Sequence, residues 1–296
     1  MTTTNKTAIG IRFHRYDDSV KQTVDTLLQS GCFKASDIHL VMDVSSSHAL
    51  PPRDVIPLSP EKIRSMGLLA IEQYGWHCGD YFLYALREKV KADYYWLLEP
   101  DVAFGKGAER AFFSKMRDIA CDYAAFNHTE KDASWAWYKG MRQFSDKVYG
   151  SAFPITRCSA KAVDMLYQTR KAHSQPFQGK NPPSLWPNDE SFVSTTLENA
   201  GLHCIDLHQQ SLCYSAKFGT LLPILRSAAA TQSGIFHPAL SFDEMKAKFL
   251  PKLDIAIRSN RVDEFIERAT QDMSPQQLKD MLTLVIKAHR VKPQQG

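Results

Sequence analysis

Two carboxylates stand two residues apart at the end of an apolar run, and their spacing is the strongest chemical signal in the chain. The run Tyr94–Leu98 leads into Glu99, Pro100 and Asp101. The run predicts a buried strand, and Pro100, which has no backbone N–H, predicts that strand pairing ends there. In extended backbone Glu99 and Asp101 project to the same side. Carboxylate oxygens at a strand's C-terminal edge suit Mg²⁺ or Mn²⁺ carrying a phosphate ligand. A solvated acidic turn is the alternative interpretation.

A second pair of carboxylates stands where a Pro-rich loop enters a predicted helix. Asn188, Asp189 and Glu190 precede or open a helix predicted over 189–199, which ends before Gly201. Asn188 or Asp189 can cap this helix, and Glu190 can interact with the positive end of its dipole. The same two carboxylates are also candidates for acid–base catalysis.

A histidine provides the third signal. His237 immediately precedes Pro238 in the segment Gly-Ile-Phe-His-Pro. A residue before proline is held in extended backbone, and imidazole is a common metal ligand. His237 is therefore a candidate third ligand beside the acidic pair, with an ordinary loop histidine as the alternative.

The elements that must position these residues alternate between strands and helices. Predicted strands cover 7–13, 38–42, 94–98, 122–127, 147–157 and 203–207, and predicted helices cover 20–30, 78–90, 107–117, 159–169 and 189–199. A Pro-rich connection follows the second strand, and 128–150 is aromatic and irregular. Alternating strands and helices predict βα units and a mainly parallel sheet.

The C-terminal stretch differs in composition from the rest of the chain. The stretch 242–291 is polar, charged and helix-periodic, and it predicts helices over about 242–249, 252–270 and 275–290, with breaks at Pro251 and Pro275. One interpretation is helices packed on the main domain or on a second subunit of a homodimer. The other is a basic face docked on an acidic membrane. Because six acidic residues dilute the positive charge, we expect the tail to be mainly structural.

The bulk composition is that of a globular protein. The chain has 296 residues with 44% hydrophobic and 23% charged content, and its net charge of +4 is too weak to indicate a nucleic-acid partner. Six scattered cysteines without C-x-x-C spacing argue against a structural zinc site. The N-terminal segment has no long apolar core, and no stretch approaches the roughly 18–20 apolar residues that span a bilayer. The sequence therefore predicts a cytoplasmic protein.

Taken in order, the motifs resemble those of a known family. The E-P-D motif is followed by an aromatic segment, by a strand leading to Arg157-Cys158-Ser159, by the N-D-E helix that ends in Gly201-Leu202, and by His237-Pro238. This set resembles the GT-A-fold glycosyltransferases, with D-x-D relaxed to E-x-D. The resemblance covers residues 7–240, roughly four-fifths of the chain. It implies a Rossmann-like α/β fold with a mixed, mainly parallel sheet, a catalytic domain over 1–240 and a helical appendage over 241–296.

The resemblance also implies roles for individual residues. Asp101 would bind Mn²⁺ or Mg²⁺ on the donor diphosphate, Glu99 would bind the metal through water or contact the ribose, and His237 would complete the metal shell. In an inverting enzyme Glu190 or Asp189 would be the general base. We favour Glu190, because Asp189 is the better expected helix cap. The donor-binding candidates are Arg12, His14, Asp43, Asp80, Glu99 and Asp101. The acceptor-binding candidates are Trp135, Trp137 and Tyr138, with packing in the core as their alternative.

The implied activity is sugar transfer from a nucleotide-sugar donor to a glycan or lipid-linked acceptor, in surface polysaccharide or lipopolysaccharide assembly. That role places the enzyme in the cytoplasm, at the inner face of the membrane. A catalytically decayed nucleotide- or sugar-binding protein and a metal-dependent phosphoester hydrolase are the alternatives. A nucleotidyltransferase is disfavoured, because residues 14–19 after the first strand contain no glycine for a phosphate loop.

Overall fold

A computed structural model describes residues 5–45, 50–51, 53–180, 185–210 and 223–290. The chain forms two compact units, each made of two chain segments. Residues 1–100 and 113–212 make the first unit, and residues 101–112 and 213–296 make the second. The predicted boundary between functional domains at residue 240 lies within the second unit and stays a prediction.

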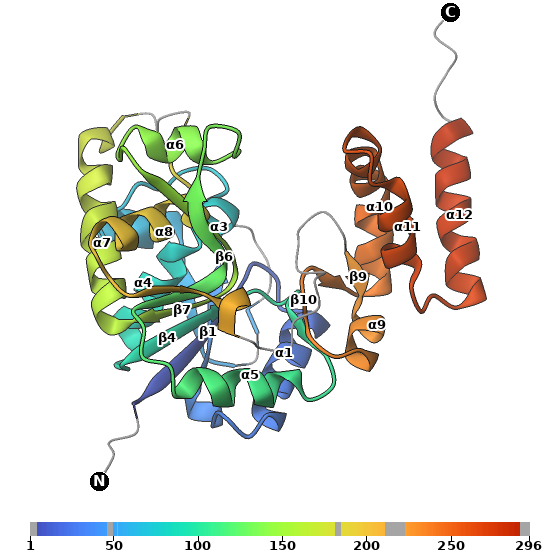
Figure 1. Ribbon diagram of the computed structural model, residues 1–296, viewed down its shortest axis with the longest axis horizontal. Helices are drawn as coiled ribbons and strands as arrows, with labels where there is room; N and C mark the ends of the chain where they lie inside the picture. The colour runs from blue at the N-terminus through green and yellow to red at the C-terminus, as the bar shows by residue number, and fades with distance from the viewer. Residues whose placement is uncertain (1–4, 46–49, 52, 181–184, 211–222, 291–296) are drawn as a thin grey trace, which may run out of the picture. The chain divides into compact units, whose positions relative to one another are not determined.

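A seven-stranded sheet forms the centre of the first unit (Figure 1). Its strands, in spatial order, are β3 (Val55–Leu58), β2 (Ile38–Asp43), β1 (Thr7–Phe13), β4 (Tyr94–Leu98), β7 (Val148–Ser159), β6 (Tyr123–Lys131) and β8 (Cys204–Asp206). Four neighbouring pairs are parallel, and β7 runs antiparallel to both β4 and β6. The predicted mixed, mainly parallel α/β sheet is confirmed.

The order of the strands reverses beside β1. The chain passes from β1 to β2 and β3 on one side and then returns to add β4 on the other. Ile11 of β1 pairs with Leu98 of β4, so Arg12 and Glu99 follow at neighbouring strand ends. In open α/β sheets this reversal point, at the C-terminal ends of the strands, is where ligands bind.

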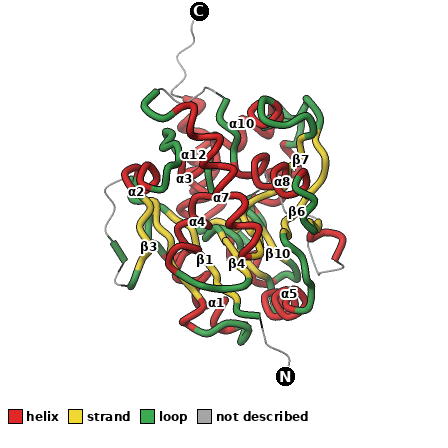
Figure 2. Tube along the Cα trace, turned by 90° about the vertical axis from the view of Figure 1, so that its left-hand side faces the viewer, coloured by secondary structure: helices red, strands yellow, loops and turns green. Residues whose placement is uncertain are grey.

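Helices cover both faces of this sheet. Figures 1 and 2 show α4 (Asp80–Lys89) and α7 (Ala160–Ser174) over one face, and Figure 1 shows α1 (Asp18–Gln29) on the other. The helix α8 (Asp189–Asn199) packs against β7. The apolar residues of α4, including Phe82 and Leu86, are buried against the sheet. Burial of this apolar face stabilises the helix on the sheet.

The remaining elements of the first unit are short. They are α2 (Pro60–Ser65), α3 (Tyr74–His77), α6 (Tyr138–Arg142) and the 3₁₀ turns η1 (Ala35–Asp37), η2 (Gln175–Phe177) and η3 (Leu207–Gln210). Sequence periodicity missed β3 and α2 inside the Pro-rich connection, and it ended β6 four residues early. Pro57 within β3 is the reason for the first omission, because proline is depleted from strands except at edges, and β3 is an edge strand.

The second unit contains two small sheets and the C-terminal helices. One sheet pairs β5 (Ala103–Phe104) with β10 (Ile235–Phe236), and the other pairs β9 (Ile224–Leu225) with β11 (Ala239–Leu240). The helices are α5 (Ala108–Arg117), whose second half is assigned to the first unit, α9 (Arg226–Thr231), α10 (Phe242–Arg258), α11 (Val262–Thr270) and α12 (Pro275–Arg290). None of the helices in the described part of the chain is both long and apolar enough to cross a membrane.

The tail helices differ from their predicted bounds. The expected break at Pro251 is wrong, because α10 continues through it, at the loss of one backbone hydrogen bond. The helix ends instead near Asn260, whose φ of 54° is left-handed. Met245, Phe249 and Phe265 are buried in one core with Phe236 and Leu240. The tail therefore packs part of its apolar stripe against protein, while Ile257, Leu282 and Ile286 are exposed.

Candidate active site

An arginine at the end of β1 holds two of the candidate carboxylates. One amino group of Arg12 pairs with Glu99 at the end of β4, and the other donates to Asp189 Oδ2 at 3.1 Å. The side chains of Arg12 and Asp189 are 8% and 4% exposed, and that of Glu99 is 23% exposed. Three segments that are far apart in sequence thus meet at the reversal point of the sheet, as expected for a ligand site in this fold class.

Gly79 makes this meeting possible. Its N–H donates to Asp189 Oδ2 at 2.8 Å. A Cβ at position 79 would lie 1.8 Å from Arg12 Nη1 and 2.5 Å from Asp189 Oδ2. No side chain fits there unless the ion pair moves, so the glycine is required by the close approach of the two groups.

The helix that carries Asp189 is capped by its neighbour. The side chain of Asn188 accepts from Ser191 N at 3.1 Å, and Asp189 is the first helical residue. Our assignment of Asp189 as the cap is therefore wrong, and Asn188, the other candidate, fills that role. Asn188 frees the Asp189 carboxylate to bind Arg12 and Gly79, and it leaves Glu190 one residue further into the first turn.

Burial sets the charge state of the two acidic residues on α8. It raises the pKa of Asp189 to about 6, although Arg12 and the Gly79 N–H act in the opposite direction. It raises the pKa of Glu190 to about 8, with further contributions from the charges of Asp189 and Glu99 and an opposing hydrogen bond from Trp137. Burial lowers the pKa of Arg12, but Glu99 and Asp189 raise it more, so the guanidinium stays charged. The two carboxyl groups of α8 thus have pKa values on either side of neutral pH, with that of Glu190 the higher.

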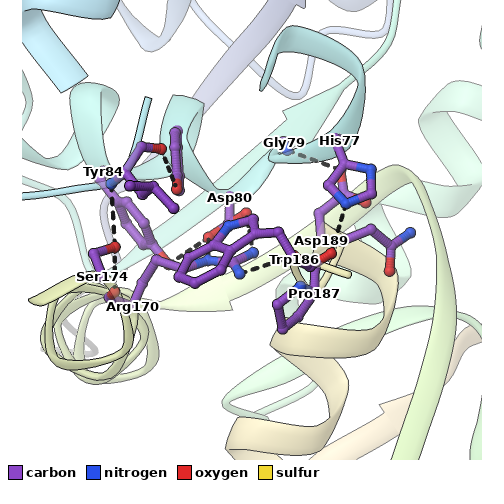
Figure 3. Close-up of polar contacts among 12 residues, drawn as sticks. His77, Gly79, Asp80, Tyr84, Arg170, Ser174, Trp186, Pro187 and Asp189 are labelled. Carbon is purple, nitrogen blue, oxygen red and sulfur yellow. Dashed lines mark hydrogen bonds and ion pairs between the residues drawn. The ribbon is translucent and has the colours of Figure 1, made fainter. Parts of the chain in front are cut away.

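A buried ion pair holds the loop that precedes α8 (Figure 3). Arg170 on α7 donates to both oxygens of Asp80, at 2.8 and 2.9 Å, and to Pro187 O at 2.9 Å. Both side chains are completely buried, and the guanidinium lies 3.7 Å from the centre of the Phe192 ring. Asp80 also accepts from Tyr84 OH at 2.8 Å. This carboxylate is fully occupied inside the core, which favours a structural role for Asp80, and its role in donor binding stays a prediction.

The other donor-binding candidates of the first unit lie in different environments. Asp43, at the end of β2, is buried and accepts from Tyr74 OH at 2.6 Å and from Ser45 N at 2.8 Å. His14 follows β1 and is exposed. Both lie at the C-terminal end of a strand, and their roles stay predictions.

The aromatic candidates separate into packed and accessible groups. Trp135 and Tyr138 pack against the apolar core, and a Cβ on Gly150 would lie 2.3 Å from the Trp135 ring. These contacts favour the core interpretation for Trp135 and Tyr138. Trp137 donates a hydrogen bond to Glu190. Of the three, Trp137 is the aromatic side chain in contact with the candidate base.

The R-x-S segment is structural. Arg157 donates to the backbone carbonyls of Met116 and Ile119 and lies 4.6 Å from the centre of the Tyr94 ring. Ser159 caps α7 by accepting from Ala162 N at 3.1 Å. Both residues fix helix ends beside the sheet.

Within the second unit, Asp101 and His237 come together. Asp101 Oδ1 and His237 Nε2 are 3.4 Å apart, with side chains 24% and 6% exposed. The backbone joins the same segments, since Ala239 N donates to Asp101 O at 2.7 Å. The predicted convergence of these two side chains is therefore found.

The donor set of this pair fits a hard or borderline divalent ion. Ligand atoms lie about 2.1 Å from such an ion, so two atoms 3.4 Å apart can share one. One carboxylate oxygen with one imidazole nitrogen is a set that Mn²⁺ accepts. Glu99 precedes Asp101 by two residues, and its role as a further ligand stays a prediction from that spacing.

Some positions that shape this site had no signal in the sequence alone. The sequence showed no reason to single out Gly79 or Arg170, because each contacts residues that are distant along the chain. Arg12 was a donor-binding candidate, and in the structure its two amino groups meet two carboxylates.

Comparisons with known proteins find similarity only at the level of structure. No family model matches the chain, and no curated protein matches it. Among solved structures, a mannosyltransferase from Pyrobaculum calidifontis in complex with GDP-Man and Mn²⁺ is similar at 8% identity and a TM-score of 0.40, over 98% of this chain and 77% of that one. The galactosyltransferase LgtC, in complex with donor and acceptor sugar analogues, is similar at 9% identity and 0.40, over 92% and 99%.

A third similar structure belongs to a different enzyme class. It is the CMP:2-keto-3-deoxy-manno-octonic acid synthetase complexed with CTP, at 12% identity and a TM-score of 0.33, over 68% of this chain and 90% of that one. The solved structures similar to this chain thus include glycosyltransferases, the class that the ordered motifs resemble, together with a synthetase complexed with CTP.

Proposed function

We propose that the protein is a glycosyltransferase that moves a sugar from a nucleotide-sugar donor to a hydroxyl group of a glycan or lipid-linked acceptor. One observation carries the proposal. Glu190, a carboxyl group with its pKa raised to about 8, is next in sequence to Asp189, which is anchored by Arg12 at the reversal point of the sheet. A general base is most effective when its pKa lies near the working pH.

Arg12 acts as a positioning residue in this scheme. Its guanidinium fixes Glu99 and Asp189 with two charged hydrogen bonds, which are stronger and more directional than neutral ones. With Asp189 held by Arg12 and Gly79, the first turn of α8 has a single position. Glu190 is thereby presented beside Trp137 in a defined orientation.

Glu190 takes the proton of the acceptor hydroxyl in an inverting reaction. As the acceptor oxygen forms its bond to the anomeric carbon, the bond from that carbon to the diphosphate oxygen breaks, and the proton moves to the Glu190 carboxylate. The low polarity that raises the pKa of Glu190 also strengthens the carboxylate as a proton acceptor once it is ionised.

Asp101 and His237 are the proposed metal-binding residues, with Glu99 as a third ligand or a ribose contact. A bound Mn²⁺ or Mg²⁺ would neutralise negative charge on the departing nucleoside diphosphate. His237 is 6% exposed and offers Nε2 beside Asp101, so its imidazole is already oriented toward the carboxylate.

The test is Glu190→Gln, which keeps the shape of the side chain and removes its basicity. We expect kcat to fall by roughly 10²–10⁴-fold with donor affinity retained. The matched control is Glu198→Gln, on the same helix, where the carboxylate pairs with His128 at 2.7 Å. It should keep near-normal kcat. Near-normal turnover in Glu190→Gln would exclude Glu190 as the base and move the role to Asp189 or to a retaining mechanism.

A catalytically decayed nucleotide-binding protein is the second candidate. The Arg12–Glu99 ion pair favours it, because it occupies one oxygen of the first carboxylate in the E-x-D motif. Thermal shift against nucleoside diphosphates and nucleotide sugars, with and without Mn²⁺, followed by an assay for nucleoside diphosphate release, separates the two. Binding without release of product would identify the decayed protein.

The biological setting, the contact with a membrane and dimerisation are also proposals. Assembly of surface polysaccharide or lipopolysaccharide, at the cytoplasmic face of a membrane, is the setting that the sequence resemblance implies. Contact with that membrane and dimerisation are tested by vesicle sedimentation and by the mass of the protein in solution.

A further inference from the structure

The side chain of Trp76 is largely exposed to solvent, although indole is mostly apolar. It lies on α3 and is 64% exposed, the largest exposed fraction among the tryptophans of the chain. A single exposed apolar side chain is common on protein surfaces, but an exposed indole beside a second aromatic ring offers a contact surface for a ligand.

The segment that carries Trp76 is held firmly on both sides. Tyr74 OH donates to Asp43 at 2.6 Å and lies 2.7 Å from Leu58 O, and a Cβ at Gly75 would lie 2.2 Å from Asp43 Oδ2. On the other side His77 Nε2 lies 2.7 Å from Trp186 O, a contact drawn in Figure 3. The indole is therefore presented from a fixed backbone, which reduces the entropy lost on binding.

Contacts between rings link Trp76 to the candidate base. The Trp76 ring centre is 5.5 Å from that of Trp137, at an interplanar angle of 67°. His77 stands edge-on to Trp137 at 5.6 Å. Trp137 in turn donates to Glu190. The order of contacts is thus Glu190, Trp137, Trp76, and the two indole planes are inclined to each other.

We propose that Trp76 and Trp137 form two successive sugar subsites and that the acceptor is a glycan of at least two rings. The inference deepens the proposed function and rests on it. Trp137 contacts the ring whose hydroxyl reacts at Glu190, and Trp76 contacts the next ring outward. Indole faces match the C–H faces of pyranoses, and two inclined faces match two rings joined by a glycosidic bond. His77, anchored by Trp186 O, keeps the Trp137 indole in place.

The experiment compares sugars of one and two rings on wild type and Trp76→Ala. Binding is followed by titration calorimetry with methyl glycosides of glucose, galactose and mannose, and with the disaccharides lactose, maltose and cellobiose. In wild type at least one disaccharide should bind more tightly than its monosaccharide. Trp76→Ala should weaken that disaccharide by about 3–10-fold and leave the monosaccharide unchanged. Leu50→Ala, at another exposed apolar side chain, should change neither.

Donor turnover is measured in parallel, with a panel of nucleotide sugars and the disaccharide that binds most tightly as acceptor. Release of nucleoside diphosphate by wild type tests the proposed function separately from the binding measurements. Absence of turnover with preserved disaccharide preference would refute the transferase and keep the two subsites. The subsites are refuted if no disaccharide binds wild type better than its monosaccharide, or if Trp76→Ala keeps the full preference.

Discussion

Asp80→Asn should destabilise the protein more than any isosteric change at its surface carboxylates. The substitution keeps the size of the side chain and removes the charge that faces Arg170, where both partners are 0% exposed. A buried guanidinium without its counter-charge costs about 3–5 kcal/mol. For a unit of some 200 residues each kcal/mol lowers Tm by about 2–4 °C, so the expected fall is about 10 °C.

The assay is thermal unfolding followed by circular dichroism, with Asp164→Asn as the control. Asp164 also binds an arginine through both oxygens, at 2.9 and 3.0 Å from Arg87, but it is 57% exposed. Exposed pairs contribute at most about 1 kcal/mol, so the control should lose no more than about 3 °C. The two variants share the chemical change and differ in burial.

A second readout connects the ion pair to the site. Arg170 also donates to Pro187 O, immediately before the residue that caps α8. Asp80→Asn should therefore lower turnover below the unfolding temperature as well. Equal losses of Tm in Asp80→Asn and Asp164→Asn would refute the reasoning that burial makes the first pair costly to break.

Four further outcomes are expected. If Glu190 is the base, kcat/KM should rise with pH to a plateau above its pKa of about 8, and Glu190→Gln should remove that limb. The pKa of Glu190 is higher in the folded protein than in the unfolded chain, where it is near 4.3. Its protonation therefore stabilises the folded protein fully below about pH 4.3, and this contribution is lost as the pH rises through about 8. The free energy of unfolding should fall less over this pH range in Glu190→Gln than in wild type. His237→Ala should weaken Mn²⁺ binding measured by calorimetry, whereas the exposed His203→Ala should not; equal affinities would remove His237 from the metal set. Deletion of 242–296 should expose Phe236 and cause aggregation seen by light scattering, and a soluble monomer that loses vesicle binding would instead support the membrane dock.

Local sequence patterns were sufficient to predict an element where its backbone conformation depends on neighbouring residues alone. The strand over 7–13 and the helix over 189–199 were predicted with the bounds that the structure has. Their signals are local, since an apolar run favours a buried strand and a cap followed by Gly201 bounds a helix. The tail was less predictable, because the preference of Pro251 to break a helix was overridden within α10.

The sequence by itself determined the fold class, the order of the longer strands and helices of the first unit, and the candidate carboxylates at Glu99, Asp101 and Glu190. It could not assign the partners of those carboxylates, because every deciding contact joins residues distant along the chain. Arg12 and Asp189 are separated by 177 positions, and Asp80 and Arg170 by 90. Only the tertiary structure placed Asp80 in the core, freed Asp189 from capping and raised the pKa of Glu190, since burial and opposite charge depend on packing and not on sequence spacing.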